Sequence, residues 1–106
     1  MAALVCFGYP LRSGSTGALR DQVLLALHTP ILFLQGSKDP LCPLDDLATV
    51  RARMTAVNQL HVIEGGNHSL EVGKRELAAS GRTQDGEDQA VLAAVRAFLE
   101  AHGAGA

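Results

Sequence analysis

The sequence predicts an α/β fold in which three parallel strands are flanked by helices. Three short runs of mainly apolar residues, Ala2–Phe7, Pro30–Gln35 and Gln59–Ile63, are each soon followed by glycine, as is typical of strands. Apolar residues at successive positions indicate strands that helices cover on both faces. The segments between the runs have helical spacing, and this alternation predicts parallel strands joined by right-handed crossovers.

Two helices are predicted between the strands. One face of the first helix carries the apolar residues Leu19, Val23 and Leu27. The second helix spans Leu44–Val57 and begins with acidic residues, which complement the positive end of the helix dipole. Its inward face is predicted to carry apolar residues three or four positions apart, namely Leu47, Val50 and Met54.

The last helix is predicted from about Glu87 to His102. Its apolar stripe comprises Val91, Ala94, Val95, Phe98 and Leu99, and Gly103 is suited to end it. The stretch before it, Ser69–Asp85, is polar and contains glycines, so we expect a solvated or disordered loop there. The predicted order of elements is therefore β-α-β-α-β-loop-α.

The composition argues against several classes of protein. A chain of 106 residues with 47% hydrophobic and 19% charged residues resembles one globular domain rather than a disordered tail. The net charge is −2 and the basic residues are dispersed, so we expect no nucleic-acid partner. The apolar runs are far shorter than the roughly 18 residues that span a bilayer. Because the first residues also lack a basic signal-peptide region, we expect no membrane association and an intracellular location, the cytoplasm or alternatively the nucleus.

The cysteines and histidines do not have the spacing of a metal site or a disulfide framework. Cys6 and Cys42 form no CxxC pair and lie beside apolar residues, which is typical of buried, reduced thiols. The four histidines show neither HxxxH nor His–Cys spacing. We therefore expect no metal ion.

Two side chains follow the predicted strands where parallel sheets place reactive groups. Asp39 lies in Gly36–Pro40, after the second strand, and His68 lies in Glu64–Ser69, after the third. Because the carboxyl ends of neighbouring parallel strands share one edge, we expect the carboxylate and the imidazole to be hydrogen-bonded. Such a pair is the orienting half of a nucleophile–His–acid triad. The alternative is that each is only a turn or loop residue, since Asp before Pro commonly forms turns.

Three blocks, Leu4–Leu11, Pro30–Asp39 and His61–Ser69, resemble the C-terminal half of an α/β-hydrolase. The resemblance covers about residues 3–100 and is to the small hydrolases of the dienelactone-hydrolase-like group. That group includes testis-expressed relatives and the α/β-hydrolase-like subunit of a nonspecific-lethal chromatin complex. The resemblance implies that Asp39 is the triad acid and His68 the triad base. It also implies hydrolysis of an ester or related acyl bond of a small molecule, without a cofactor.

The family nucleophile precedes the part that this chain resembles. It is a serine in a sharp strand-to-helix turn, and the oxyanion hole is built from that turn and an earlier loop. We therefore expect residues 1–106 to form a partial α/β-hydrolase domain, the C-terminal portion of the fold with its last three strands and their helices. A truncated gene model, a partial reading frame or a split product would each account for it. The chain alone is expected to be inactive, and the alternative function is a non-catalytic interaction module of a protein complex.

Two residues of the chain are candidate substitutes for the missing nucleophile. Ser15 lies in Ser13–Gly17, which loosely resembles G-x-S-x-G and precedes the acid and base in the family order. However, several residues, Pro10 among them, separate this segment from the first strand, whereas a nucleophile elbow is the strand-to-helix turn itself. We interpret the segment as a loop with a helix-capping hydroxyl near Thr16. Cys42 has no activating neighbour in the sequence, so neither residue is expected to be the nucleophile.

The first predicted strand, Ala2–Phe7, is expected to lie at an open edge of the sheet. It is apolar throughout and contains no lysine or inward charge of the kind that protects natural edges. We expect it to mediate self-association or to bind a protein partner that supplies the missing strands.

Overall fold

A three-stranded parallel sheet forms the centre of the computed structural model, which describes residues 3–12 and 21–102. The strands are β1 (Leu4–Phe7), β2 (Ile31–Gly36) and β3 (Asn58–Ile63), and they lie in the order β1-β2-β3. The prediction of an α/β fold with three parallel strands is therefore confirmed. Each strand begins or ends within one or two residues of its predicted bound, and Ala2 lies outside the described residues.

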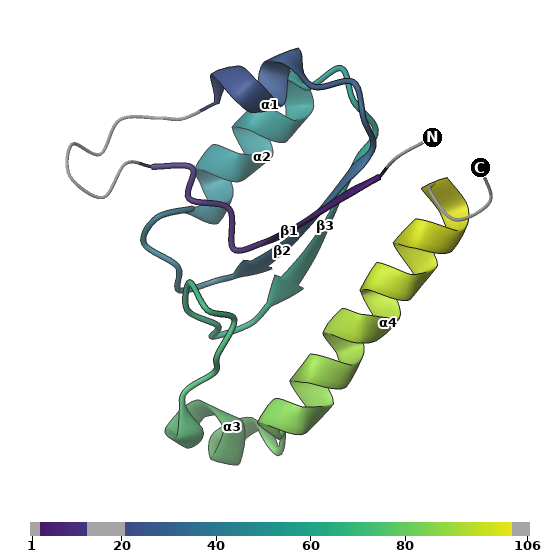
Figure 1. The fold of residues 1–106 in the computed structure, drawn as a ribbon. Coiled ribbons are helices and arrows are strands. Elements are labelled where there is room, and N and C mark those ends of the chain that lie inside the picture. The colour runs from purple at the N-terminus through teal and green to yellow at the C-terminus, as the bar shows by residue number, and fades with distance from the viewer. Residues whose placement is uncertain (1–2, 13–20, 103–106) are drawn as a thin grey trace.

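The helices cover both faces of the sheet (Figure 1). Helices α1 (Gln22–Ala26) and α2 (Leu44–Arg53) lie on one face, and α4 (Gln84–His102) lies on the other. Helix α3 (Lys74–Ser80) lies beyond the carboxyl ends of the strands. All six residues of the central strand β2 are buried because helices cover it on both sides and strands flank it.

The core has two halves, one on each face of the sheet. Side chains alternate along a strand, so Ile31 and Phe33 of β2 point to one face while Leu32 and Leu34 point to the other. The first face packs against the buried residues Leu24, Leu47 and Val50 of α1 and α2. The second packs against Val91 and Phe98, the buried residues of α4.

Helices α1 and α2 each differ from the prediction, α1 in which residue is buried and α2 in its length. The predicted inward residue Val23 is 71% exposed, and its neighbour Leu24 is buried instead. Helix α1 has only five residues, too few for a periodic stripe to define its inward side, and Leu19 lies outside the described residues. Helix α2 ends at Arg53 because Met54 adopts an extended conformation.

The predicted helix Leu44–Val57 is therefore four residues longer than α2, which ends at Arg53. Val57 lies outside the helix and is 53% exposed. Its predicted inward face is otherwise confirmed, since Leu47 and Val50 are buried and Met54 packs against the same cluster.

The predicted loop over Ser69–Asp85 is wrong. Seven of its residues form α3, and the first turn of α4 starts at Gln84, earlier than the predicted start near Glu87. The local reason is the run Lys74–Ser80, which is rich in helix formers. It ends at Gly81, which adopts the left-handed conformation (φ 70°) that commonly ends helices.

The prediction that helices cover the strands on both faces holds only for the middle of β1, where Val5 and Cys6 pack against the two halves of the core. Its end residues Leu4 and Phe7 are 41% and 60% exposed, although the strand lies beside the fully buried β2.

The structure also bears on membrane insertion. Within residues 3–12 and 21–102, no helix combines the length and apolar character needed to cross a bilayer. The predicted helix stop Gly103 lies outside the described residues.

Candidate active site

The loops that follow β2 and β3 cross at very short range. The Lys38 amide donates to the Gly66 carbonyl (2.9 Å), and the Gly65 amide donates to the Ser37 hydroxyl (2.7 Å). A side chain on Gly36 would overlap the backbone of Gly66, so this crossing requires glycine. The crossing brings the two loops that carry the predicted site residues into one place.

Asp39 and His68 form a hydrogen-bonded pair at this crossing. The distance between His68 Nδ1 and Asp39 Oδ2 is 2.8 Å, which confirms the predicted contact at the carboxyl ends of adjacent strands. The Asp39 side chain is 0% exposed, whereas the His68 side chain is 43% exposed. Because a carboxylate only accepts, this geometry assigns the proton to Nδ1 and leaves Nε2 as the acceptor nitrogen of the neutral ring.

The buried carboxylate has two further donors. The Leu41 amide donates to Asp39 Oδ1 (2.8 Å), and the Gln35 side-chain Nε2 donates to Asp39 Oδ2 (2.6 Å). Three donors therefore compensate for the loss of water around this group. Sequence analysis missed Gln35, although an amide near the end of an otherwise apolar strand is the signal that could have identified it.

The end of β1 also contributes to the position of His68. Gly8 follows β1 with a φ of 69°, and a side chain there would overlap the carbonyl oxygen of His68. The Gly8 amide donates to the Leu34 carbonyl of β2 (2.8 Å), which fixes this approach. The Asn67 side chain accepts from two amides of the following turn, those of Ser69 and Glu71. Backbone from the ends of β1 and β2 thus lies close to the segment that carries His68 at the end of β3.

No nucleophile is in place beside the imidazole in the described part of the chain. Among residues 3–12 and 21–102, no hydroxyl or thiol group is hydrogen-bonded to His68. Ser15 lies outside the described residues. Burial, followed by the charge of Asp39, raises the pKa of the Cys42 thiol to about 11. Such a thiol is almost entirely protonated at neutral pH, so it is not an activated nucleophile.

The comparison with known families agrees with this architecture. A model of the alpha/beta hydrolase domain family matches residues 1–100 of the chain. The chain belongs to the alpha/beta hydrolase domain family. The matched region includes all three strands, Asp39 and His68. No solved structure matches the chain.

In this alpha/beta hydrolase domain, a cluster of ion pairs joins α3 to the loop that carries Asp39. Glu76 of α3 pairs with Lys38 (2.7 Å) and with Arg82 (3.4 Å), and Arg82 also pairs with Glu87 (2.7 Å). The hydrogen bond from Lys38 is the main cause of the lowered pKa of the Glu76 carboxyl. The Glu76 carboxylate also lies against Gly65, where any side chain would overlap it.

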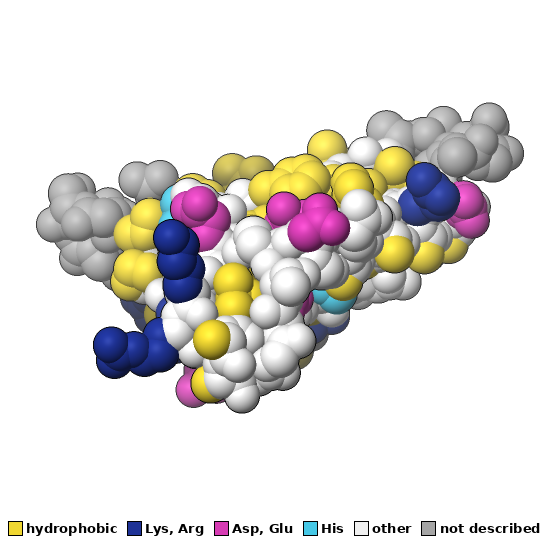
Figure 2. All heavy atoms as spheres, turned by 90° about the horizontal axis from the view of Figure 1, so that it is seen from below, with side chains coloured by type: hydrophobic (Ala, Val, Ile, Leu, Met, Phe, Trp, Pro, Cys, Tyr) yellow, Lys and Arg dark blue, Asp and Glu magenta, His cyan; other side chains and the backbone are white. Residues whose placement is uncertain are grey.

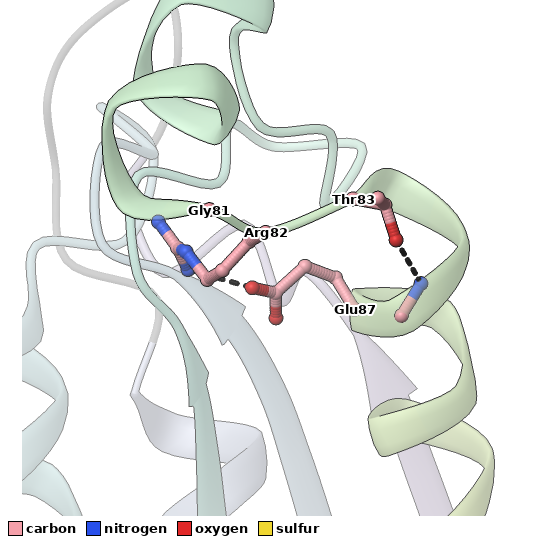
Figure 3. A pocket seen from close by; sticks show the side chains of 5 residues that line it. Gly81, Arg82, Thr83 and Glu87 are labelled. Atoms are coloured by element: carbon pink, nitrogen blue, oxygen red, sulfur yellow. Dashed lines mark hydrogen bonds and ion pairs between the residues drawn. The ribbon is translucent and has the colours of Figure 1, made fainter.

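A surface cavity of about 320 Å³ lies beside this cluster (Figure 3). It is lined by Gly81, Arg82, Thr83, Gly86 and Glu87. Neither site residue lines it, and the charges of Arg82 and Glu87 are already paired across it. Within the described residues, no group of three or more metal-ligating side chains occurs. The carboxylate–imidazole pair, rather than this cavity, is therefore the candidate active site of the hydrolase domain.

Figure 2 shows the molecule from below, with charged and hydrophobic side chains distinguished by colour. On the face that Figure 2 shows, acidic and basic side chains lie in small separate groups with hydrophobic side chains between them. This distribution matches the dispersed basic residues and the net charge of −2 in the sequence.

Proposed function

We propose that Asp39 and His68 are the acid and the general base of a serine-hydrolase triad that acts on an ester or related acyl bond. The observation that carries the proposal is the 2.8 Å bond between a fully buried carboxylate and a half-exposed imidazole. With Nδ1–H bonded to the buried carboxylate, Nε2 of the partly exposed ring is the nitrogen left to act as a base. Membership of the alpha/beta hydrolase family adds weight to this chemistry.

In the proposed reaction, Nε2 of His68 accepts the hydroxyl proton of a serine as its oxygen attacks the acyl carbon. The charge of Asp39 stabilises the imidazolium that forms, without itself taking the proton. The imidazolium then donates this proton to the leaving alkoxide, which departs as an alcohol. Water repeats the same two proton transfers to release the acid and restore the serine.

We further propose that the serine comes from a segment outside the described residues, and that the domain is of the dienelactone-hydrolase-like group. The lack of any hydroxyl on the His68 ring among the residues described supports the first point. The blocks Pro30–Asp39 and His61–Ser69 support the second. In this proposal the residues described supply the orienting pair, and other segments supply the nucleophile and the oxyanion hole.

A second candidate function is a non-catalytic interaction module. The exposure of Leu4 (41%) and Phe7 (60%) on the outer strand favours it, because large apolar side chains at a strand edge are typical of interfaces. In this case the Asp39–His68 pair has only a structural role at the loop crossing.

Hydrolysis of p-nitrophenyl butyrate tests the catalytic proposal on the 106-residue chain. We expect no turnover above that of the His68→Ala variant, because a base without its nucleophile and oxyanion hole retains little of the machinery. Turnover that is lost in Ser15→Ala would instead place the nucleophile inside the chain.

The same substrate tests the pair in any natural protein that contains this sequence and hydrolyses that substrate. There, Asp39→Asn is expected to lower kcat by roughly 10³–10⁴-fold, since the imidazole loses its orienting acceptor. Asp85→Asn, at an exposed position of α4, is the matched control and should leave kcat unchanged. Unchanged kcat in both Asp39→Asn and His68→Ala would overturn the triad and favour the interaction module.

A further inference from the structure

Gln35 is an unusual residue for the centre of a parallel sheet. It lies on β2 with 0% exposure, and the other buried side chains of that strand are apolar. Its Nε2 donates to Asp39 Oδ2 at 2.6 Å, so the amide reaches the same carboxylate oxygen that His68 contacts. Its carbonyl oxygen Oε1 is buried and has no hydrogen-bond partner within the described residues.

The unpartnered oxygen shows that the amide is not there for the stability of the fold alone. A buried carbonyl without a partner has lost its hydrogen bonds to water and gained none in return, which destabilises the folded state. An apolar side chain of similar length would avoid that cost. Among the described residues, the side chain of Gln35 makes one hydrogen bond, which its nitrogen donates to Asp39.

We infer that Gln35 is a positioning residue, which holds the Asp39 carboxylate in the orientation that fixes the tautomer of His68. This inference rests on the proposed acid and base roles of the pair. The Leu41 amide holds Oδ1 (2.8 Å) and the Gln35 amide holds Oδ2 (2.6 Å). Rotation of the carboxylate about its Cβ–Cγ bond would break both of these hydrogen bonds, so Oδ2 stays directed at Nδ1.

The tautomer of His68 is the property that depends on this orientation. A neutral imidazole carries its proton on either nitrogen, and only the Nδ1–H form leaves Nε2 free to accept a proton from a nucleophile. If Gln35 is replaced by methionine, the side chain keeps its length but no longer donates. The carboxylate then gains rotational freedom, and the population of the Nδ1–H form falls.

Imidazole ¹⁵N chemical shifts of the 106-residue chain at about pH 9, above the ordinary titration range of histidine, measure the two tautomers directly. Spectra are recorded well below the Tm of each variant, so that unfolding does not contribute. We expect the ratio of Nδ1–H to Nε2–H forms of His68 to fall at least about threefold in Gln35→Met, since a hydrogen bond to a charged acceptor is lost. Gln35→Leu is measured in parallel in case Gln35→Met does not fold. Gln59→Met, at an exposed position of β3, is the matched control and should leave the ratio unchanged.

The outcomes separate this inference from the proposed function. A ratio that falls in Asp39→Asn but stays at the wild-type value in the Gln35 variants overturns the positioning role and leaves the Asp39–His68 pair intact. An equal fall in Gln59→Met also overturns it. A wild-type chain in which Nδ1–H does not predominate contradicts the proposed acid and base assignment itself.

Discussion

A carboxylate that is buried at the end of a strand must be matched by donors, and Asp39 has three of them. Leu41, Gln35 and His68 donate to its two oxygens, and its side chain is 0% exposed. The negative charge of Asp39 reaches one more titratable neighbour, the buried thiol of Cys42, whose pKa it raises in addition to the larger effect of burial. At the scale of single residues, this one carboxylate governs the chemistry of the groups around it.

Alkylation of Cys42 is predicted to be slow in the folded chain. With a thiol pKa of about 11, the reactive thiolate is scarce at pH 8. We expect iodoacetamide to react at least roughly 100-fold more slowly with folded Cys6→Ser protein than with the same protein in urea. Mass spectrometry at timed intervals measures the rate. Adding Asp39→Asn should accelerate the reaction, and equal rates with and without urea would contradict the assignment.

At the scale of elements, the loop crossing after β2 and β3 decides where the site residues lie. Its close backbone contact at Gly36 and Gly66 leaves no room for a side chain. Gly36→Ala is predicted to lower the free energy of unfolding by about 2–4 kcal/mol, because backbone atoms must move apart. Urea unfolding followed by circular dichroism measures the change.

Gly73→Ala is the matched control for Gly36→Ala. Gly73 has a φ of −61° and open space around its Cβ position. We expect a change within about 1 kcal/mol, since Gly73 is the N-cap that precedes α3 and no neighbouring atom has to move. Equal losses of stability in the two variants would show that the crossing does not require glycine.

Helix α3 is joined to its surroundings by ion pairs of Glu76 and by Leu77, which packs against the core, and none of its residues is fully buried. The folded pKa of Glu76 is lowered by Lys38 and by Arg82. A lowered carboxyl pKa means that the ion pairs stabilise the docked helix above the ordinary glutamate range. That contribution is lost as the pH falls through the lower folded pKa.

Amide hydrogen exchange is therefore predicted to show weaker protection of Lys74–Ser80 at about pH 3 than at pH 7, and in high salt. Protection factors, corrected for intrinsic exchange, are the measurement. Glu76→Gln should reproduce the low-pH behaviour at pH 7, whereas Glu100→Gln, at an exposed position of α4, should not. Protection in α3 that responds to neither pH nor Glu76→Gln would show that apolar packing holds the helix.

At the scale of the whole molecule, the sheet of the described residues is open along β1. Phe7 and Leu4 are exposed there, and this strand pairs only with β2 in the three-stranded order. We predict that the 106-residue chain self-associates at micromolar concentration, because the edge offers backbone donors and acceptors beside apolar side chains.

Sedimentation velocity of Phe7→Lys tests this edge, since an edge lysine opposes strand pairing. The variant is expected to sediment as a smaller species than the wild-type chain. Leu92→Lys is the matched control, because Leu92 on α4 is 59% exposed and Phe7 is 60% exposed. A wild-type monomer with a sharp thermal transition would contradict the prediction and indicate that three strands form a self-sufficient fold.

Those features that depend on a few neighbouring residues were predictable from the sequence. Apolar runs ended by glycine identified the three strands, and three- and four-residue spacing identified α2 and the greater part of α4. The contact between Asp39 and His68 followed as well, because parallel strands necessarily bring their carboxyl ends to one edge.

Tertiary structure alone decided the features that depend on partners far away in the chain. Helix α3 is docked by Lys38 and Arg82, and the burial of Leu24 instead of Val23 depends on how α1 meets the sheet and α2. The role of Gln35 depends on the pairing of Asp39 with His68, which lies 29 positions further along the chain. Periodicity records which side of an element is apolar, but burial and charge pairing are fixed only when separate elements meet in space.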